Sequence, residues 1–178
     1  LEPVLDQEGV LWIDDSKATN DDAARRALGA FGERRIIWIG GGRSKGVGPD
    51  NLVEEVTRRA AHAMLIGETA MELDRSLAAH GFANRHLAGT LAEAVGEARR
   101  LARPGDVVLL APGYASFDQF SDFEARGRAF VALLEDGGAD PLRAEASRAA
   151  SSAAGALSAG SPRAQAPGAE VSSGDGEV

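Results

Sequence analysis

Short apolar runs alternate with longer helix-like segments along this chain, and the alternation limits the folds that it can adopt. The apolar spacing predicts strands at residues 4–5, 10–13, 35–39, 63–66 and 106–110. It predicts helices at residues 21–30, 51–61, 69–79, 90–102 and 118–135, with Thr69 as the cap of the third. Strands that alternate with helices indicate a Rossmann-like α/β fold, a largely parallel sheet with helices on both faces.

Three loops directly follow predicted strands, at residues 14–20, 40–48 and 111–118. The carboxyl ends of parallel strands lie at one edge of a sheet, and ligands of such folds bind beyond that edge. We therefore expect the three loops to converge on one site.

The loop at residues 14–20 reads Asp-Asp-Ser-Lys-Ala-Thr-Asn and leads into a predicted helix. Thr19 or Asn20 can cap that helix, and backbone N–H groups at a helix start can hold an anion. Lys17 adds a positive charge. From these residues alone, a capped turn with exposed charges is the simpler interpretation, and an anion site is the alternative.

The other two loops also allow either a purely structural or a ligand-binding interpretation. Gly40–Gly42 would let the backbone approach a ligand closely. The surrounding residues form neither a P-loop nor the Rossmann glycine motif, so alone they favour a flexible loop. Ser116 precedes the predicted helix start at residue 118 and is expected to cap it.

The composition excludes several classes of function. The net charge of -8 argues against a nucleic-acid partner, whose binding surface is normally basic. The absence of cysteine excludes disulfides and cysteine metal sites. No apolar run has the length of a membrane span and no signal peptide is visible, so we expect no membrane partner and a cytoplasmic location. His62, His80 and His86 show no partner pattern and are expected at the surface or at sheet edges.

The chain divides into two parts at residue 137. In residues 138–178, 28 of the 41 residues are Ala, Gly, Ser or Pro and none is aromatic. Such a segment buries too little apolar surface to offset its ordering entropy. Residues 1–137 are therefore expected to form the folded domain, and residues 138–178 a disordered tail.

Three motifs in order along the chain carry a family resemblance. They are Trp12–Asn20, the glycine loop Gly40–Gly46, and Ala115–Phe120 followed by Phe123-Glu124 and Arg126-Gly127. Together they make residues 1–134 resemble the C-terminal domain of the D-glutamate-adding Mur ligases. The Ala111–Tyr114 stretch departs from that family's pattern, in which Ser-Pro-Ala-Cys or Ser-Pro-Ala-Ala is usual.

The resemblance implies specific roles for residues in the three loops. Asp15 and Lys17 match positions at the ATP site, and Lys17 is the candidate catalytic residue. The candidate D-glutamate contacts are Thr19, Lys45, Ser116, Phe117 and Phe123. The bulkier Tyr114 puts the shape of the pocket in question.

The family implies an ATP-dependent amide ligase of peptidoglycan synthesis (EC 6.3.2.9), which adds D-glutamate to UDP-N-acetylmuramoyl-L-alanine through an acyl phosphate. Its Mg²⁺ ligands lie in the central domain, so no metal site is expected on this chain. The chain begins without Met inside a predicted strand, so we expect a fragment that lacks the N-terminal and central domains of a monomeric enzyme and is inactive alone. A non-catalytic α/β module for a nucleotide or small dicarboxylate, and an inert fragment, remain alternatives.

Overall fold

The computed structural model describes residues 1–46 and 48–136. The strands are β1 (Glu2–Gln7), β2 (Val10–Asp14), β3 (Ile36–Gly41), β4 (Ala60–Ile66), β5 (Arg85–Gly89) and β6 (Val107–Leu110). The helices are α1 (Asp21–Gly29), α2 (Asp50–Arg59), α3 (Ala70–Ala79), α4 (Leu91–Leu101) and α5 (Phe123–Glu135). Residue 47 of the glycine loop and the predicted tail at 138–178 lie outside the described residues. No helix in the described ranges is long and apolar enough to cross a membrane.

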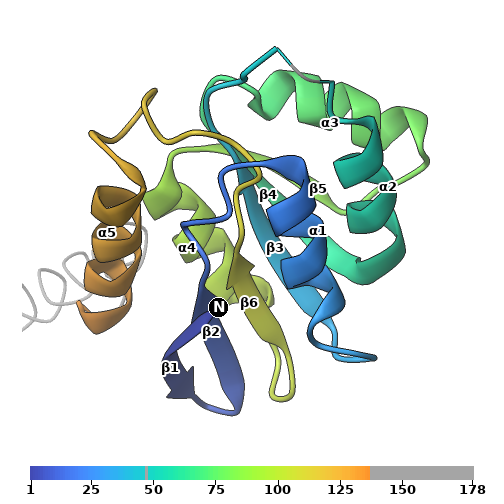
Figure 1. The fold of residues 1–178 in the computed structure, drawn as a ribbon. Helices are drawn as coiled ribbons and strands as arrows, with labels where there is room; N and C mark the ends of the chain where they lie inside the picture. The colour runs from blue at the N-terminus through green and yellow to red at the C-terminus, as the bar shows by residue number, and fades with distance from the viewer. Residues whose placement is uncertain (47, 137–178) are drawn as a thin grey trace, which may run out of the picture. The chain divides into compact units, whose positions relative to one another are not determined.

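The six strands form one sheet in the order β1-β2-β6-β3-β4-β5 (Figure 1). β1 runs antiparallel to β2, and every other neighbouring pair is parallel. The predicted α/β fold with a largely parallel sheet is therefore confirmed.

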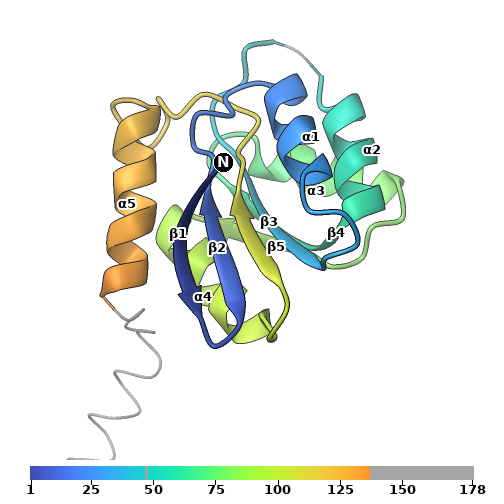
Figure 2. The same cartoon turned by 60° about the horizontal axis from the view of Figure 1, so that its bottom comes forward.

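Helices cover the two faces of this sheet, as Figure 2 shows. Successive side chains of a strand point to opposite faces. Trp38 packs in a core cluster with residues of α1, α2 and α3, including Leu28, while Ile37 packs in a second cluster with residues of α4 and α5, including Phe130. Because β3 is buried on both faces, its sequence reads as a continuous apolar run rather than as an alternation.

Strand β5 was not predicted from the sequence. It begins with Arg85 and His86, and most of its residues are partly or fully exposed. β5 is the edge strand next to β4. One of its sides faces no neighbouring strand, so it lacks the apolar run that identifies a buried strand.

One predicted helix start is wrong, and one predicted cap makes no side-chain capping bond. α5 begins at Phe123 rather than at residue 118, because Asp122 accepts a hydrogen bond from the backbone of Ala125 at 2.6 Å and caps the helix there. Ser116 therefore caps no helix. Thr69 precedes α3 but makes no side-chain capping bond; its hydroxyl instead accepts from the backbone N–H of Gly42 at 3.1 Å.

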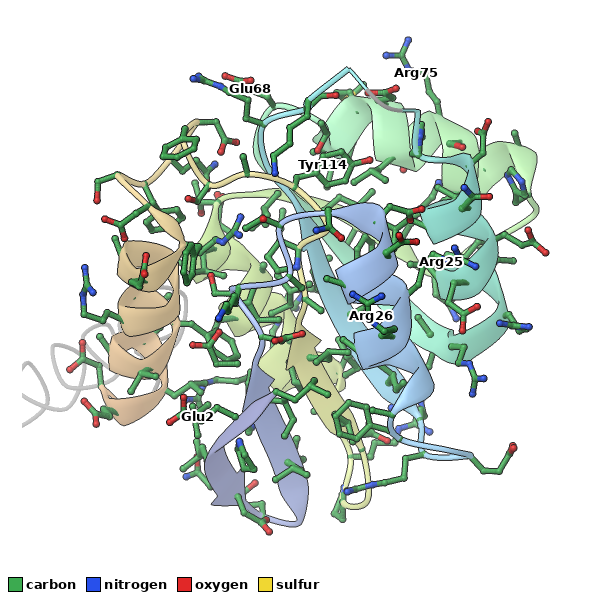
Figure 3. All side chains as sticks on the ribbon, in the orientation of Figure 1. Glu2, Arg25, Arg26, Glu68, Arg75 and Tyr114 are labelled. Atoms are coloured by element: carbon green, nitrogen blue, oxygen red, sulfur yellow. The ribbon has the colours of Figure 1, made fainter. Side chains whose placement is uncertain are left out.

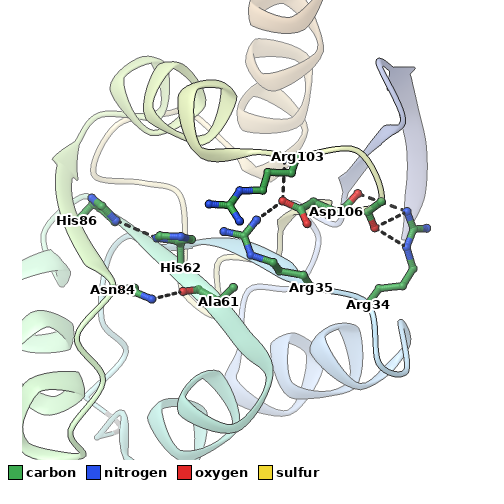
Figure 4. Close-up of polar contacts among 9 residues, drawn as sticks. Arg34, Arg35, Ala61, His62, Asn84, His86, Arg103 and Asp106 are labelled. Carbon is green, nitrogen blue, oxygen red and sulfur yellow. Dashed lines mark hydrogen bonds and ion pairs between the residues drawn. The ribbon is translucent and has the colours of Figure 1, made fainter.

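Two of the three histidines meet at the amino ends of the strands, a pairing that the sequence did not indicate, although both are partly exposed and His86 lies on the edge strand, as expected. His62 Nδ1 on β4 lies 3.2 Å from His86 Nε2 on β5 (Figure 4). Three charged residues lie on the His62 side of this pair: Arg35, Arg103 and Asp106. Arg35 forms an ion pair with Asp106. On the other side of the pair, His86 Nδ1 lies 3.7 Å from Glu97 of α4. A neutral pair can share one N–H···N bond, whereas two imidazolium rings would both donate and repel.

We expect this pair to make the fold sensitive to acid. Burial, with a further contribution from Arg35, lowers the pKa of His62 below its ordinary 6.5. Such a histidine takes up a proton on unfolding, so its contribution to stability is present above the unfolded-state pKa and is lost as the pH falls. The thermal midpoint should therefore fall more steeply from about pH 7.5 to about pH 5.5 in the wild type than in His62→Gln. His80→Gln, on an exposed residue after α3, is the matched control. Equal slopes for His62→Gln and the wild type would contradict the prediction.

Candidate functional site

The three loops that follow β2, β3 and β6 converge on the carboxyl edge of the sheet, as predicted. These three strands are parallel neighbours. Gly113 N donates to Ala18 O at 2.8 Å and Gly41 N donates to Pro112 O at 2.9 Å. Arg43 and Ala115 form an antiparallel bridge. The loop at residues 111–118 is thus tied to each of the other two by backbone hydrogen bonds.

A hollow of about 240 Å³ lies where the loops meet. Its lining residues are Thr19, Lys45, Ala115, Ser116, Phe117, Asp122, Phe123 and Glu124. All five predicted D-glutamate contacts, which come from three separate segments of the chain, are therefore neighbours around one hollow. Their predicted roles remain predictions.

The capping of α1 leaves Thr19 available to this hollow. Asn20 is the cap: its side-chain oxygen accepts from Ala23 N at 2.9 Å. Lys45 Nζ donates to the backbone oxygen of Thr19 at 3.1 Å. The ammonium group of the glycine loop therefore reaches across to the first loop and forms part of the wall of the hollow.

The two phenylalanines and Ser116 differ in exposure. Ser116 is 2% exposed, and its backbone oxygen accepts from Gln119 N at 3.1 Å and from Phe120 N at 2.8 Å. This turn replaces the predicted first turn of α5. Phe117, at 61% exposed, projects from it, whereas Phe123 is partly buried at the start of α5.

Asp15 and Lys17, the predicted ATP-site residues, do not line the hollow. Lys17 is exposed, and Asp15 is partly exposed. The neighbouring Asp14 is partly buried, and burial raises the pKa of its carboxyl group, opposed by a hydrogen bond from Ser16 N at 2.7 Å. These residues lie in the same segment as Thr19 but are not among the residues that line the hollow.

Arg126 holds the loops together, a role that sequence reasoning missed. It is 1% exposed. Its Nε donates to Ser16 Oγ and its Nη2 to Ser16 O, both at 2.9 Å, and its two terminal nitrogens lie 3.3 and 3.2 Å from Tyr114 O. Burial lowers the pKa of Arg126 to about 10, opposed by the charges of Asp118 and Asp14. One guanidinium group thus joins α5 to two of the three loops.

The hydroxyl group of Ser16 makes its hydrogen bonds within the protein. Its hydroxyl donates to Phe123 O at 2.8 Å while it accepts from Arg126. The side chain is 4% exposed. The Ser16 hydroxyl therefore links the first loop to the start of α5.

The Ala111–Tyr114 stretch, which departs from the family pattern, does not fill the hollow. Tyr114 is 7% exposed and packs in the core cluster that contains α1, α2 and α3 residues (Figure 3). Burial, with the charges of Glu72 and Asp21, raises the pKa of its phenol to about 12. The carbonyl oxygen of Ala111 accepts from Trp38 Nε1 at 2.8 Å. The core accommodates the ring of Tyr114, and the backbone oxygen of Tyr114 accepts hydrogen bonds from Arg126.

Within residues 1–46 and 48–136, no group of three or more His, Asp or Glu side chains is placed to hold a metal ion. The two lysines of the whole sequence, Lys17 and Lys45, both lie in loops of the candidate site. The hollow carries one ammonium group, from Lys45, and two carboxylates, from Asp122 and Glu124. It therefore presents charges of both signs to a small ligand.

Known proteins resemble this chain in sequence and in fold. It is 43% identical to the UDP-N-acetylmuramoylalanine--D-glutamate ligase of Streptomyces coelicolor, over 76% of this chain and 30% of that protein. It is 46% identical to the enzyme of the same name from Myxococcus xanthus, over 76% of this chain and 29% of that protein. The chain thus spans about a third or less of the length of these relatives.

Solved structures share the fold at low sequence identity. A murein peptide ligase of Psychrobacter arcticus superposes with a TM-score of 0.51 at 19% identity, over 73% of this chain and 29% of that one. A domain from a putative ligase of Haemophilus ducreyi superposes with a TM-score of 0.52 at 19% identity, over 75% of this chain and 98% of that one. The family model described as "Mur ligase, glutamate ligase domain" matches residues 1–113. This chain therefore belongs to the Mur ligase family, as a glutamate ligase domain.

Proposed function

We propose that this chain is the part of a UDP-N-acetylmuramoylalanine--D-glutamate ligase that binds D-glutamate and completes the ATP site. The observation that carries the proposal is the hollow at the sheet edge, which gathers the five candidate D-glutamate residues from three segments. Relatives that bear this enzyme name are 43% and 46% identical to the chain.

The charges around the hollow suit an amino acid with a second carboxylate. Lys45 offers an ammonium group to one carboxylate, and Ser116 and Thr19 offer polar atoms beside it. Asp122 and Glu124 offer negative charge to the α-ammonium group. A hollow of about 240 Å³ suits a small ligand, since drug-sized ligands need about 300 Å³ or more.

In the proposed reaction, ATP phosphorylates the terminal carboxylate of UDP-N-acetylmuramoyl-L-alanine. The amine of D-glutamate then attacks the acyl carbon, an amide forms, and phosphate leaves beside ADP. This chain holds the nucleophile in place, which removes the entropic cost of bringing it to the acyl phosphate. Lys17 lies on the exposed loop beside the hollow and stabilises negative charge on the transferring phosphate. Mg²⁺ and its ligands belong to the rest of the cytoplasmic, monomeric ligase.

D-glutamate binding to the chain itself tests the proposal. Because the chain has two lysines, lysine-selective ¹³C and ¹⁵N labelling reports on Lys17 and Lys45 separately by NMR. Titration with millimolar D-glutamate should shift the Lys45 signals strongly and the Lys17 signals weakly. L-glutamate is the stereochemical control, and a Ser116→Ala chain should lose most of the response. An absence of shifts, or equal responses to both enantiomers, would contradict D-glutamate binding here.

A further inference from the structure

The loop between β4 and α3, Gly67–Thr69, touches two walls of the hollow without lining it. One wall is the glycine loop that carries Lys45, and the other is the segment that carries Ser116. The family motifs in the sequence do not include residues 67–69. We call these three residues the bridging loop.

The bridging loop is bonded to the glycine loop through main chain and side chain. Gly42 N donates to Thr69 Oγ1 at 3.1 Å in a buried bond, and Thr69 N donates to Gly42 O at 3.0 Å. Thr69 is 3% exposed. Gly42 has a φ of 140°, and a Cβ there would lie 2.3 Å from the backbone oxygen of Ala115. The backbone of Gly42 is therefore enclosed between Thr69 and Ala115.

An ion pair adds a second connection one residue further along. Arg43 Nη2 lies 2.7 Å from Glu68 Oε1, and Arg43 Nε lies 3.2 Å from Glu68 Oε2, so the pair is bidentate. Both side chains are about half exposed. Planar, bidentate Arg–carboxylate pairs restrict geometry more than a point contact does. Arg43 also forms the backbone bridge to Ala115 and stands two residues before Lys45.

The bridging loop reaches the second wall through Asp118. Glu68 N donates to Asp118 Oδ2 at 3.0 Å. Gly67 has a φ of 71°, and a Cβ on it would lie 2.1 Å from the same Asp118 oxygen and 2.9 Å from Gly42 Cα. The three segments are therefore packed too closely for any side chain at residue 67. Asp118 stands two residues after Ser116.

We propose that the bridging loop positions Lys45 relative to Ser116 and thereby sets the affinity for D-glutamate. The proposal rests on the function proposed above. Gly67, Glu68 and Thr69 are positioning residues, because they act through Gly42, Arg43 and Asp118 rather than on the ligand. Because Arg43 is paired with Glu68, the carboxylate of the ligand binds Lys45 rather than Arg43.

Charge reversal in the complete ligase tests the Arg43–Glu68 connection. Arg43→Glu and Glu68→Arg should each raise the KM for D-glutamate at least about fivefold, which corresponds to about 1 kcal/mol. The KM for ATP should change less than about twofold, because the ATP residues lie outside the hollow. The double reversal restores an ion pair and should return the KM for D-glutamate to within about twofold of the wild type, as a double-mutant cycle requires of coupled residues. Arg75→Glu, at an exposed α3 residue whose Nε donates to the backbone oxygen of Met71, is the matched control (Figure 3).

The buried bond of Thr69 gives an independent variant. Thr69→Val removes the acceptor for Gly42 N while it keeps the shape of the side chain, and should raise the KM for D-glutamate about tenfold; Thr69→Ser should keep a value near the wild type. The thermal midpoint of each variant shows that it is folded. The bridging-loop inference is overturned if Lys45→Ala raises the KM while these variants do not, or if the double reversal is no better than either single change. If Lys45→Ala itself leaves the KM unchanged, the proposed D-glutamate site fails instead.

Discussion

Replacing Arg126 with alanine is expected to lower the free energy of unfolding by about 2–4 kcal/mol, which corresponds to a fall of roughly 8–16 °C in the thermal midpoint. The guanidinium group is 1% exposed and is the donor to the backbone oxygens of Ser16 and Tyr114. Without it, both acceptors stay buried and lose their donor, and a cavity is left behind. Urea denaturation of the chain measures the change.

Arg128 on the same helix provides the matched control. Its side chain is 72% exposed, and its nearest carboxylate, on Asp122, is 4.0 Å away. Arg128→Ala should therefore change the stability by no more than about 0.5 kcal/mol. Arg126→Lys should fall between the two, since an ammonium group keeps the charge but loses the planar fork of donors. An Arg126→Ala chain as stable as Arg128→Ala would show that this network contributes no net stability.

The second large effect is expected at Lys45 in the complete ligase. Its ammonium group would hold a D-glutamate carboxylate in both the ground state and the transition state, so Lys45→Ala should raise the KM for D-glutamate with little change in kcat. A charge-assisted hydrogen bond contributes about 1.5–3 kcal/mol, hence roughly a tenfold to hundredfold rise in KM.

Lys17→Ala is the informative comparison for that experiment. Lys17 is exposed in the first loop and does not line the hollow. If it acts on the transferring phosphate, its loss should lower kcat more than it raises the KM for D-glutamate. Steady-state kinetics at saturating ATP, with D-glutamate varied, separates the two lysines. A wild-type KM for D-glutamate in Lys45→Ala would return the glycine loop to the flexible-loop interpretation.

The apolar pattern was sufficient to predict the buried strands and the convergence of the three loops. β3 is recognisable because both of its faces are covered, and convergence follows from the parallel order alone. β5 was missed for the complementary reason: it lies at an edge, so its polar residues carry no burial signal. The start of α5 was misplaced because Ser116 and Asp122 are both acceptable caps locally, and only the turn at residues 116–120 decides between them.

The sequence by itself therefore determined the fold class, the order of the elements apart from β5, and the loops that meet at the sheet edge, because period and turn chemistry are local properties. Tertiary structure alone decided which polar groups face the hollow and which support it. In the sequence, Arg126 is indistinguishable from an exposed charged helix residue, yet packing buries it against Ser16 and Tyr114. Thr69 reads as a cap, yet its hydroxyl bonds to Gly42, 27 residues away. Contacts of this kind depend on how the strands place distant loops, and no local pattern encodes that distance.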